Sequence, residues 1–262
     1  MSILERIYAD KRLEVAAAER DRPLAAVRSS AEASPIPPDF RRVFRGDFPG
    51  ELAVIAEIKR RSPSKGPLSP ELDPVRMARI YRDCGAAAIS VLTDRKYFGG
   101  SLDDLRDAAG ASGLPVLRKD FIFSPYQVYE ARAAGASAVL LIAGMLSDEE
   151  LERSIELARK TGLAALVEVH DRAELERALG AGAELAGINN RDLHSFEVRL
   201  ETTFELRPLV PPGIPVVAES GIRTRADIDA LIAADVDGAL IGEALVTAPD
   251  PGALLAELAG VR

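Results

Sequence analysis

The sequence of 262 residues has no tryptophan, one cysteine, two histidines and no long apolar run. A single cysteine cannot form an intrachain disulfide or a cysteine-cluster metal site, so we expect Cys84 to be a small buried side chain in a reducing compartment. No run approaches the roughly 20 apolar residues that span a bilayer, and the charged N-terminus is unlike a secretory signal. These absences predict a cytoplasmic protein that does not bind membranes.

Positive charge is also scarce. Lysine and arginine total 33 against 41 aspartates and glutamates, which gives a net charge of -8. This balance argues against a nucleic-acid-binding protein. His170 and His194 lack the spacing of metal ligands, and we interpret both as solvated loop residues. The glycine-rich motifs of nucleotide-binding proteins do not occur either, so we expect neither a metal nor an organic cofactor.

What the chain does contain is a regular alternation of apolar, β-branched runs and helical patterns, read as one domain over residues 1–262. The predicted helices include 74–84, 125–134, 148–161, 172–180 and 225–234. The predicted strands are Leu52–Lys59, Ala86–Thr93, Pro115–Lys119, Ala138–Ile142, Ala164–Val169, Leu185–Asn189, Pro215–Ser220 and Gly238–Ile241. Eight strand–helix units favour a closed (β/α)8 TIM barrel over an open doubly wound sheet.

An N-terminal section, residues 1–48, precedes the first predicted strand. Ile3, Leu4 and Ile7 recur at helical spacing among charges, which predicts an amphipathic helix over about the first 20 residues. The prolines between Ser34 and Asp39 interrupt this pattern, and a short helix is expected at Phe40–Phe44. Further along, Ser101 with Asp104 and Thr224 with Asp227 have the spacing of helix capping boxes.

Charged and amide side chains follow most of the predicted strands. Glu57 and Lys59 share one face of the first strand because alternate strand residues point the same way. The third, fifth, sixth and seventh strands lead to Lys119, Glu168, Asn189 and Glu219 respectively, whereas the fourth ends without a polar group at Gly144. Functional residues of a TIM barrel gather at the C-terminal ends of its strands, so these groups predict an active site there.

The last two strands indicate what this site holds. Ser220-Gly221 and Gly242-Glu243 follow strands seven and eight, where barrels commonly bind phosphate through backbone amides. Lys59 and Lys119 are candidate proton donors or charge stabilisers, and Glu57 or Glu168 could serve as a base. Asn189 suits holding a hydroxyl or a carboxylate.

Several segments resemble indole-3-glycerol phosphate synthase of tryptophan biosynthesis. They include residues 55–59 (Ile-Ala-Glu-Ile-Lys), 62–66 (Ser-Pro-Ser-Lys-Gly), 118–121 (Arg-Lys-Asp-Phe), 166–170, 187–193, 219–222 and 241–243. The resemblance covers essentially the whole chain. It implies a barrel whose mouth is covered by the N-terminal helical extension. It also implies a reaction that closes the indole ring of 1-(2-carboxyphenylamino)-1-deoxyribulose 5-phosphate with loss of carbon dioxide and water.

The resemblance also implies roles. Lys119 is the general acid that protonates the substrate ketone, and Lys59 holds a substrate carboxylate or phosphate and can supply the later proton. Glu57 and Glu168 share the assignment as base. The remaining candidates contact or orient the substrate: Asn189 and Ser220 directly, Gly221, Gly242 and Glu243 at the phosphate, Phe98 and Phe121 beside the aromatic ring, and Ser62, Arg191 and Glu219 elsewhere.

Two alternatives differ from this interpretation. An isomerase acting on a sugar phosphate usually relies on Asp or Cys acid–base pairs, and the lysines on strands one and three argue against it. A non-catalytic barrel that binds a phosphorylated ligand, or that docks in a pathway complex, predicts the loss of some rim charges, yet all are present. The sequence does not determine whether the protein is a monomer or associates with pathway partners.

Overall fold

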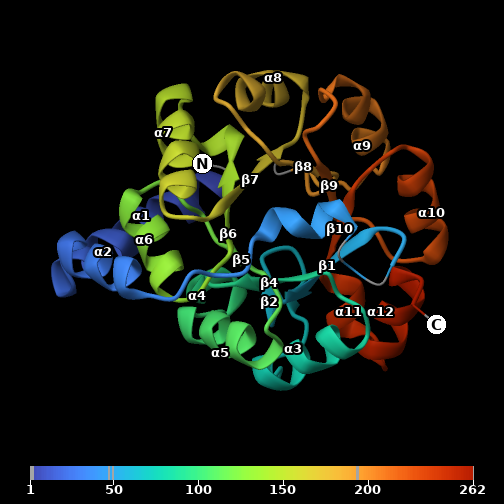
Figure 1. Cartoon of the computed structure of the whole chain (residues 1–262), viewed down its shortest axis with the longest axis horizontal. Helices are drawn as coiled ribbons and strands as arrows, with labels where there is room; N and C mark the ends of the chain where they lie inside the picture. Colours follow the sequence, from blue (N-terminus) through green and yellow to red (C-terminus); the bar gives the residue numbers. More distant parts are fainter. Residues whose placement is uncertain (1–2, 47, 49, 193–194, 262) are drawn as a thin grey trace.

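Eight parallel strands form a closed barrel in the computed structural model, which describes residues 3–46, 48, 50–192 and 195–261. Helices surround this ring (Figure 1), so the prediction of a (β/α)8 barrel is confirmed. In ring order the strands are β1 (Ala53–Ile58), β4 (Ala88–Leu92), β5 (Val116–Lys119), β6 (Ala138–Ile142), β7 (Ala164–Val169), β8 (Ala186–Asn189), β9 (Val216–Glu219) and β10 (Gly238–Ile241).

Alternation along each strand decides which side chains enter the barrel. In β1, Ala53 and Ile55 belong to the inner core cluster, whereas Val54 and Ile58 belong to the outer cluster between the strands and the helices. Glu57 therefore continues the inward row, as the sequence predicts. Because of the same alternation, several strands end with an inward-pointing side chain at the C-terminal end of the barrel, just beyond the apolar core.

The helices of the barrel wall cover the outer faces of the strands (Figure 1). They are α3 (Pro74–Asp83), α5 (Leu102–Ser112), α6 (Pro125–Ala133), α7 (Asp148–Lys160), α8 (Arg172–Gly180), α9 (Glu201–Leu206), α10 (Arg225–Ala233) and α12 (Pro251–Ala259). Shorter elements lie in the loops: hairpin β2 (Arg61–Ser62) and β3 (Gly66–Pro67), α4 (Arg95–Phe98), α11 (Glu243–Thr247), η2 (Ala143–Met145) and η3 (Arg207–Leu209).

Helix caps follow the predicted spacing with one exception. Thr224 and Asp227 form the full capping box of α10. Ser101 accepts the Asp104 backbone N–H at the start of α5, which is one half of the predicted box. The Asp104 carboxylate binds the guanidinium of Arg60 instead, at 2.6 and 2.9 Å. This ion pair ties the loop after β1 to α5.

The N-terminal section contains α1 (Ile3–Asp21), α2 (Leu24–Ala33) and the 3-10 helix η1 (Phe40–Arg45). The sequence predicts α1 and η1 but not α2 as a separate helix, because α2 is short and buries only Val27 and Ala31 before the proline-rich break. Phe40 and Val43 of η1 pack into the inner core cluster. Phe44 lies beside Gly238 at the first residue of β10. η1 therefore closes the N-terminal end of the barrel.

The expectation that Cys84 is buried is wrong. Cys84 is the C-cap residue of α3 and is only partly covered. Its position at a helix end leaves one side open to solvent, while Gly252 of α12 lies against the sulfur. None of the described helices has the length and continuous apolar sequence needed to cross a membrane.

The inner core cluster generates a stability prediction. Leu117 on β5 is fully buried in it, so Leu117→Ala is expected to lower the free energy of unfolding by about 2–5 kcal/mol. Leu13→Ala is the matched control, because Leu13 on α1 is 71% exposed. Urea unfolding followed by circular dichroism measures both. Equal stabilities of the two variants would contradict this account of the core.

Candidate active site

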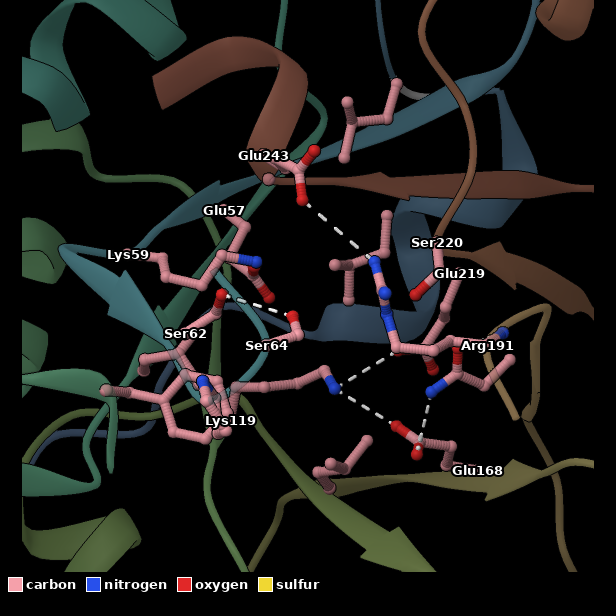
Figure 2. Close-up of a pocket in the computed structure, with 18 of the residues that line it drawn as sticks. Glu57, Lys59, Ser62, Ser64, Lys119, Glu168, Arg191, Glu219, Ser220 and Glu243 are labelled. Atoms are coloured by element: carbon pink, nitrogen blue, oxygen red, sulfur yellow. Dashed lines mark hydrogen bonds and ion pairs between the residues drawn. The ribbon is translucent and has the colours of Figure 1, made fainter. Parts of the chain in front are cut away.

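A cavity of about 180 Å³ opens at the C-terminal ends of the strands (Figure 2). Its lining includes every residue that the sequence analysis placed in the site: Glu57, Lys59, Ser62, Phe98, Lys119, Phe121, Glu168, Asn189, Arg191, Glu219, Ser220, Gly221, Gly242 and Glu243. The strands bring them together because each occupies an inward position at a strand end or in the loop that follows. Together with apolar residues of β4 and β6 and with Ile3 and Ile7 of α1, they make all eight strands contribute to the lining of one cavity.

The Lys119 side chain points into this cavity toward Glu168 (Figure 2). Its Nζ lies 3.0 Å from Glu168 Oε2 and 3.2 Å from Glu219 Oε2. Burial lowers the pKa of Lys119, but the charges of Glu168, Glu219 and Glu57 outweigh burial and raise the pKa above its ordinary value. Lys119 is therefore an ammonium ion enclosed by carboxyl groups.

Glu168 is the most highly coordinated of these carboxylates. Burial raises its pKa, but the Lys119 charge and donated hydrogen bonds outweigh burial and hold the pKa well below its usual range. Asn189 Nδ2 donates to Glu168 Oε1 at 3.0 Å, and Asn189 Oδ1 accepts the Arg191 backbone N–H at 3.0 Å. The amide of Asn189 is fixed in this way, and Glu168 is an oriented anion.

A second lysine–carboxylate pair lies on β1 and in the loop that follows. Lys59 Nζ is 2.6 Å from Glu57 Oε1. Glu57 fits because Gly242 has no side chain: a Cβ at Gly242 would lie 2.2 Å from Glu57 Oε1. This contact gives a physical reason for a glycine directly after β10, beyond its ability to turn the chain.

Glu219 differs from the other carboxyl groups because it has too few partners. Burial raises its pKa, and although Lys119 lowers it, the neighbouring Glu168 and Glu57 charges raise it again, to about 8. Its Oε1 is buried without a hydrogen-bond partner among the described residues and lies against Gly187, where a Cβ would be 2.4 Å away. These surroundings favour the protonated form of Glu219.

Backbone amides and arginine surround the end of the cavity next to β9 and β10. Ser220 and Gly221 both have left-handed backbone conformations, with φ of 65° and 87°. A side chain at Gly221 would also collide with Val198, 2.7 Å from the added Cβ. Arg191 lies on the same side, with its Nη2 4.0 Å from Glu243 Oε2. Glu243 is held by Lys65 at 2.6 Å, a contact that the sequence analysis missed.

Apolar side chains also line the cavity. The rings of Phe98 and Phe121 lie 6.1 Å apart, tilted by 42°, and Leu140, Ile142 and Leu240 line the barrel side. The cavity thus combines apolar and aromatic surface with lysines, carboxyl groups and an arginine.

Arg118 and Asp120, which flank Lys119 in sequence, have other partners, although Asp120 also lines the edge of the cavity. Arg118 is buried in the wall, where it bonds to Asp120 and to Glu130. Asp120 also binds Lys11 of α1, whose Nζ is 3.1 Å from Asp120 and 2.8 Å from Asp94. Of the Arg-Lys-Asp segment, only Lys119 is an inward-pointing group at the centre of the cavity, because strand side chains alternate.

The sequence analysis missed Lys11, which is only 2% exposed. A signal was present: Lys11 follows Ile3 and Ile7 at four-residue spacing, which places it on the buried face of α1. Ile3 and Ile7 themselves line the cavity.

The interpretation of His170 as a solvated loop residue is wrong. Its side chain is 13% exposed and lies between Glu168 and Glu174, because it directly follows β7 on the inward side. His194 lies outside the described residues. Within the part of the chain that the structure covers, no three His, Cys, Asp or Glu side chains are placed so that they could hold a metal ion.

Comparison with known proteins identifies a family that this chain matches. Residues 4–258 match the family model of indole-3-glycerol phosphate synthase. A protein of that name from Albidiferax ferrireducens is 50% identical over 257 residues, covering 98% of this chain and 97% of its own. One from Dehalococcoides mccartyi is 48% identical over 260 residues, covering 98% and 99%.

Solved structures support the fold alone. A thiamine phosphate pyrophosphorylase from Pyrococcus furiosus superposes with a TM-score of 0.61 at 22% identity, covering 81% of this chain and 96% of its own. A 3-hexulose-6-phosphate synthase from Salmonella typhimurium gives 0.63 at 13% identity, covering 80% and 98%. Both likenesses agree with the closed barrel.

The pKa of Glu219 predicts how stability depends on pH. The unfolded chain releases this proton near the ordinary value of 4.5, whereas the folded protein keeps it to about 8. The folded state therefore binds more protons between these pH values, and this group makes the unfolding free energy fall with rising pH, by at most about 1.4 kcal/mol per pH unit.

Urea unfolding at pH 5, 6.5 and 8 checks this slope. We expect it to be smaller in Glu219→Gln than in the wild type and unchanged in Glu149→Gln, whose side chain is 71% exposed on α7. Identical slopes in the wild type and Glu219→Gln would mean that Glu219 is ionised in the folded protein.

Proposed function

This chain belongs to the indole-3-glycerol phosphate synthase family, and we propose that its Lys119 cluster carries out the ring closure of that enzyme's reaction. The protein is a carboxy-lyase of tryptophan biosynthesis that acts on a phosphorylated small molecule. In this reaction the ring carbon that bears the substrate carboxylate attacks a ketone, and carbon dioxide and then water are lost. The chemistry thus needs an acid at the ketone, a base for the final proton and a site for each anionic end.

The observation that carries the assignment of the acid is the ammonium of Lys119 among Glu168, Glu219 and Glu57. As the ring carbon attacks, the ketone oxygen gains negative charge and takes a proton from Lys119. The new carbon–carbon bond forms, the oxygen becomes a hydroxyl, and the following loss of carbon dioxide restores the aromatic ring. A positioned acid of this kind contributes about 10²- to 10⁴-fold to the rate.

The transfer of this proton makes the neighbouring carboxylate of Glu168 more basic. Once Lys119 is neutral, Glu168 has lost its nearest countercharge, and its affinity for a proton rises. We assign to Glu168 the removal of the final proton during dehydration, with Lys59 supplying the proton that leaves with the hydroxyl as water. Lys59 follows β1 and Glu168 lies on β7, the strand across the barrel from β1, which suits an acid and a base acting on opposite sides of one ring.

The substrate lies across the cavity with its two ends apart. The phosphate binds the backbone N–H groups of Ser220, Gly221, Gly242 and Glu243 together with the Arg191 guanidinium. The anthranilate ring packs against the side of the cavity that Phe98 and Phe121 line. Support for this orientation comes from the left-handed Ser220 and Gly221 backbone and from the presence of Arg191 and the two phenylalanines in one cavity.

Residues 1–48 act as an extension of the single barrel domain, with α1 over the mouth of the cavity. Ile3 and Ile7 reach the cavity lining. Lys11 holds α1 down, since burial lowers its pKa but the charges of Asp120 and Asp94 outweigh burial and keep it an ammonium ion. On the surface, Lys96 and Tyr97 both bind Asp10 of the same helix.

Replacement of Lys119 tests the proposed acid. Lys119→Met is expected to lower kcat by about 10²- to 10⁴-fold in an assay of indole fluorescence with the carboxyphenylamino-deoxyribulose phosphate, because the ketone loses its proton donor. Lys160→Met serves as the control, since Lys160 is 65% exposed on α7. A folded Lys119→Met protein, checked by circular dichroism, that retains wild-type turnover would reassign the acid role.

The role of α1 is tested by removing its buried charge. Lys11→Met leaves Asp94 and Asp120 without their shared cation, so we expect α1 to detach locally, with faster backbone hydrogen exchange in residues 3–21 and a higher KM. Arg20→Met, on the exposed face of the same helix, should change neither. Faster exchange with an unchanged KM would show that α1 does not cover bound substrate.

A further inference from the structure

His170 lies between two carboxylates at the edge of the active site. Its ring Nδ1 is within hydrogen-bond distance of Glu174 Oε2, at 2.9 Å. Its buried Nε2 lies 3.3 Å from Glu168 Oε1, an ion-pair contact without hydrogen-bond geometry. The side chain is 13% exposed, and the ring has an acidic partner on each side. No step of the reaction proposed above uses it.

Glu174 is itself held in place from several directions. Its Oε2 also accepts the His170 backbone N–H at 2.8 Å, and its own backbone N–H binds the Asp171 carboxylate at the start of α8. Its Oε1 lies over Gly144 in η2, where a Cβ would be 2.3 Å away. The strand end that carries no polar group, after β6, is thus the place that makes room for Glu174.

This arrangement fixes the charge of the ring. Burial lowers the pKa of His170, but the two adjacent carboxylates, Glu168 and Glu174, outweigh burial and raise the pKa to about 10. Other nearby charges face elsewhere: Lys119 contacts the far oxygen of Glu168, and Arg177 of α8 binds Asp148 and the Ala143 carbonyl. η2 itself carries no ionisable side chain.

The two oxygens of Glu168 have different partners. Oε1 accepts a hydrogen bond from Asn189 Nδ2 at 3.0 Å and has the His170 ring as an ion-pair neighbour at 3.3 Å, whereas Oε2 contacts Lys119 at 3.0 Å. When Lys119 gives its proton to the ketone, only Oε2 loses a partner. Oε1 stays bound, and Oε2 becomes the oxygen that can accept a proton.

We propose that His170 is a positioning residue whose imidazolium, held by Glu174, orients Glu168 so that Oε2 faces the substrate. The ring also supplies the positive charge that stays beside Glu168 after Lys119 has discharged. This inference rests on the assignment of Glu168 as the base. His170 exchanges no proton with the substrate, so the reaction needs no additional co-reactant.

The charge of the ring can be measured without turnover. The chain has two histidines, so long-range proton–nitrogen-15 spectra of the wild type and of His194→Gln assign both rings. We expect His170 to stay protonated to above pH 9 in the wild type. In Glu174→Gln its midpoint should fall by about 1 to 3 pH units, because one of two countercharges is lost.

A matched control separates this effect from a general change in charge. Glu176→Gln removes a carboxylate from the same helix at a side chain that is 70% exposed, and it should leave the His170 midpoint in place. A wild-type midpoint near 6.5, or one that Glu174→Gln does not move, would overturn the proposal.

Kinetics then distinguish positioning from a purely structural role. Glu174→Gln should show a kcat that falls as pH rises through the new His170 midpoint and recovers at lower pH, with little change in KM. His170→Gln should lower kcat at all pH values by about 10- to 100-fold, the effect of displacing a reacting group. A loss of kcat in folded Glu174→Gln that is the same at every pH would overturn the proposal.

Absence of turnover in the wild type would instead reject the proposed function, while the spectra still report the charge of His170.

Discussion

The ammonium of Lys119, enclosed by the carboxyl groups of Glu168, Glu219 and Glu57, is the interaction on which the site depends. Each of these charges alone would be costly inside a barrel, because burial disfavours ionised groups. Together they compensate one another, and the closed ring of strands keeps them from separating. Glycines of neighbouring strands leave the required space: Gly242 beside Glu57 and Gly187 beside Glu219. The fold thus holds a protonated acid and ionised carboxylates within a few ångströms.

This balance explains how one proton transfer can prepare the next. A lysine with a raised pKa is a weak acid in the free enzyme, yet the substrate brings a ketone oxygen whose growing negative charge competes with the carboxylates for the proton. After the transfer, Glu168 is more basic than before. His170 and Asn189 keep its other oxygen fixed. The acid of the first step and the base of the last are therefore coupled through one contact, and the apolar floor of the cavity strengthens that coupling.

Strand parity explains why much of this could be predicted. Alternation placed Glu57 and Lys59 on one face, and the barrel topology brought the ends of distant strands to one cavity. Predictions failed where partners lie outside the strand pattern. His170 was misread because its carboxylate Glu174 comes from α8 and fits only over Gly144. Lys11 was missed because its aspartates, Asp94 and Asp120, follow two other strands. Such pairings depend on tertiary distance, which local spacing does not contain.

The central claim is that Lys119 is an ammonium ion in the free enzyme and meets the substrate ketone. The chain has six lysines, so nitrogen-15 spectra of lysine-labelled protein, assigned with Lys119→Arg, can follow its Nζ directly. The account predicts that Lys119 stays protonated to above pH 10 and that its signal moves when an analogue with an alcohol in place of the ketone binds. The account would be contradicted if Lys119 were neutral at pH 7, or if its Nζ signal did not move when the analogue binds.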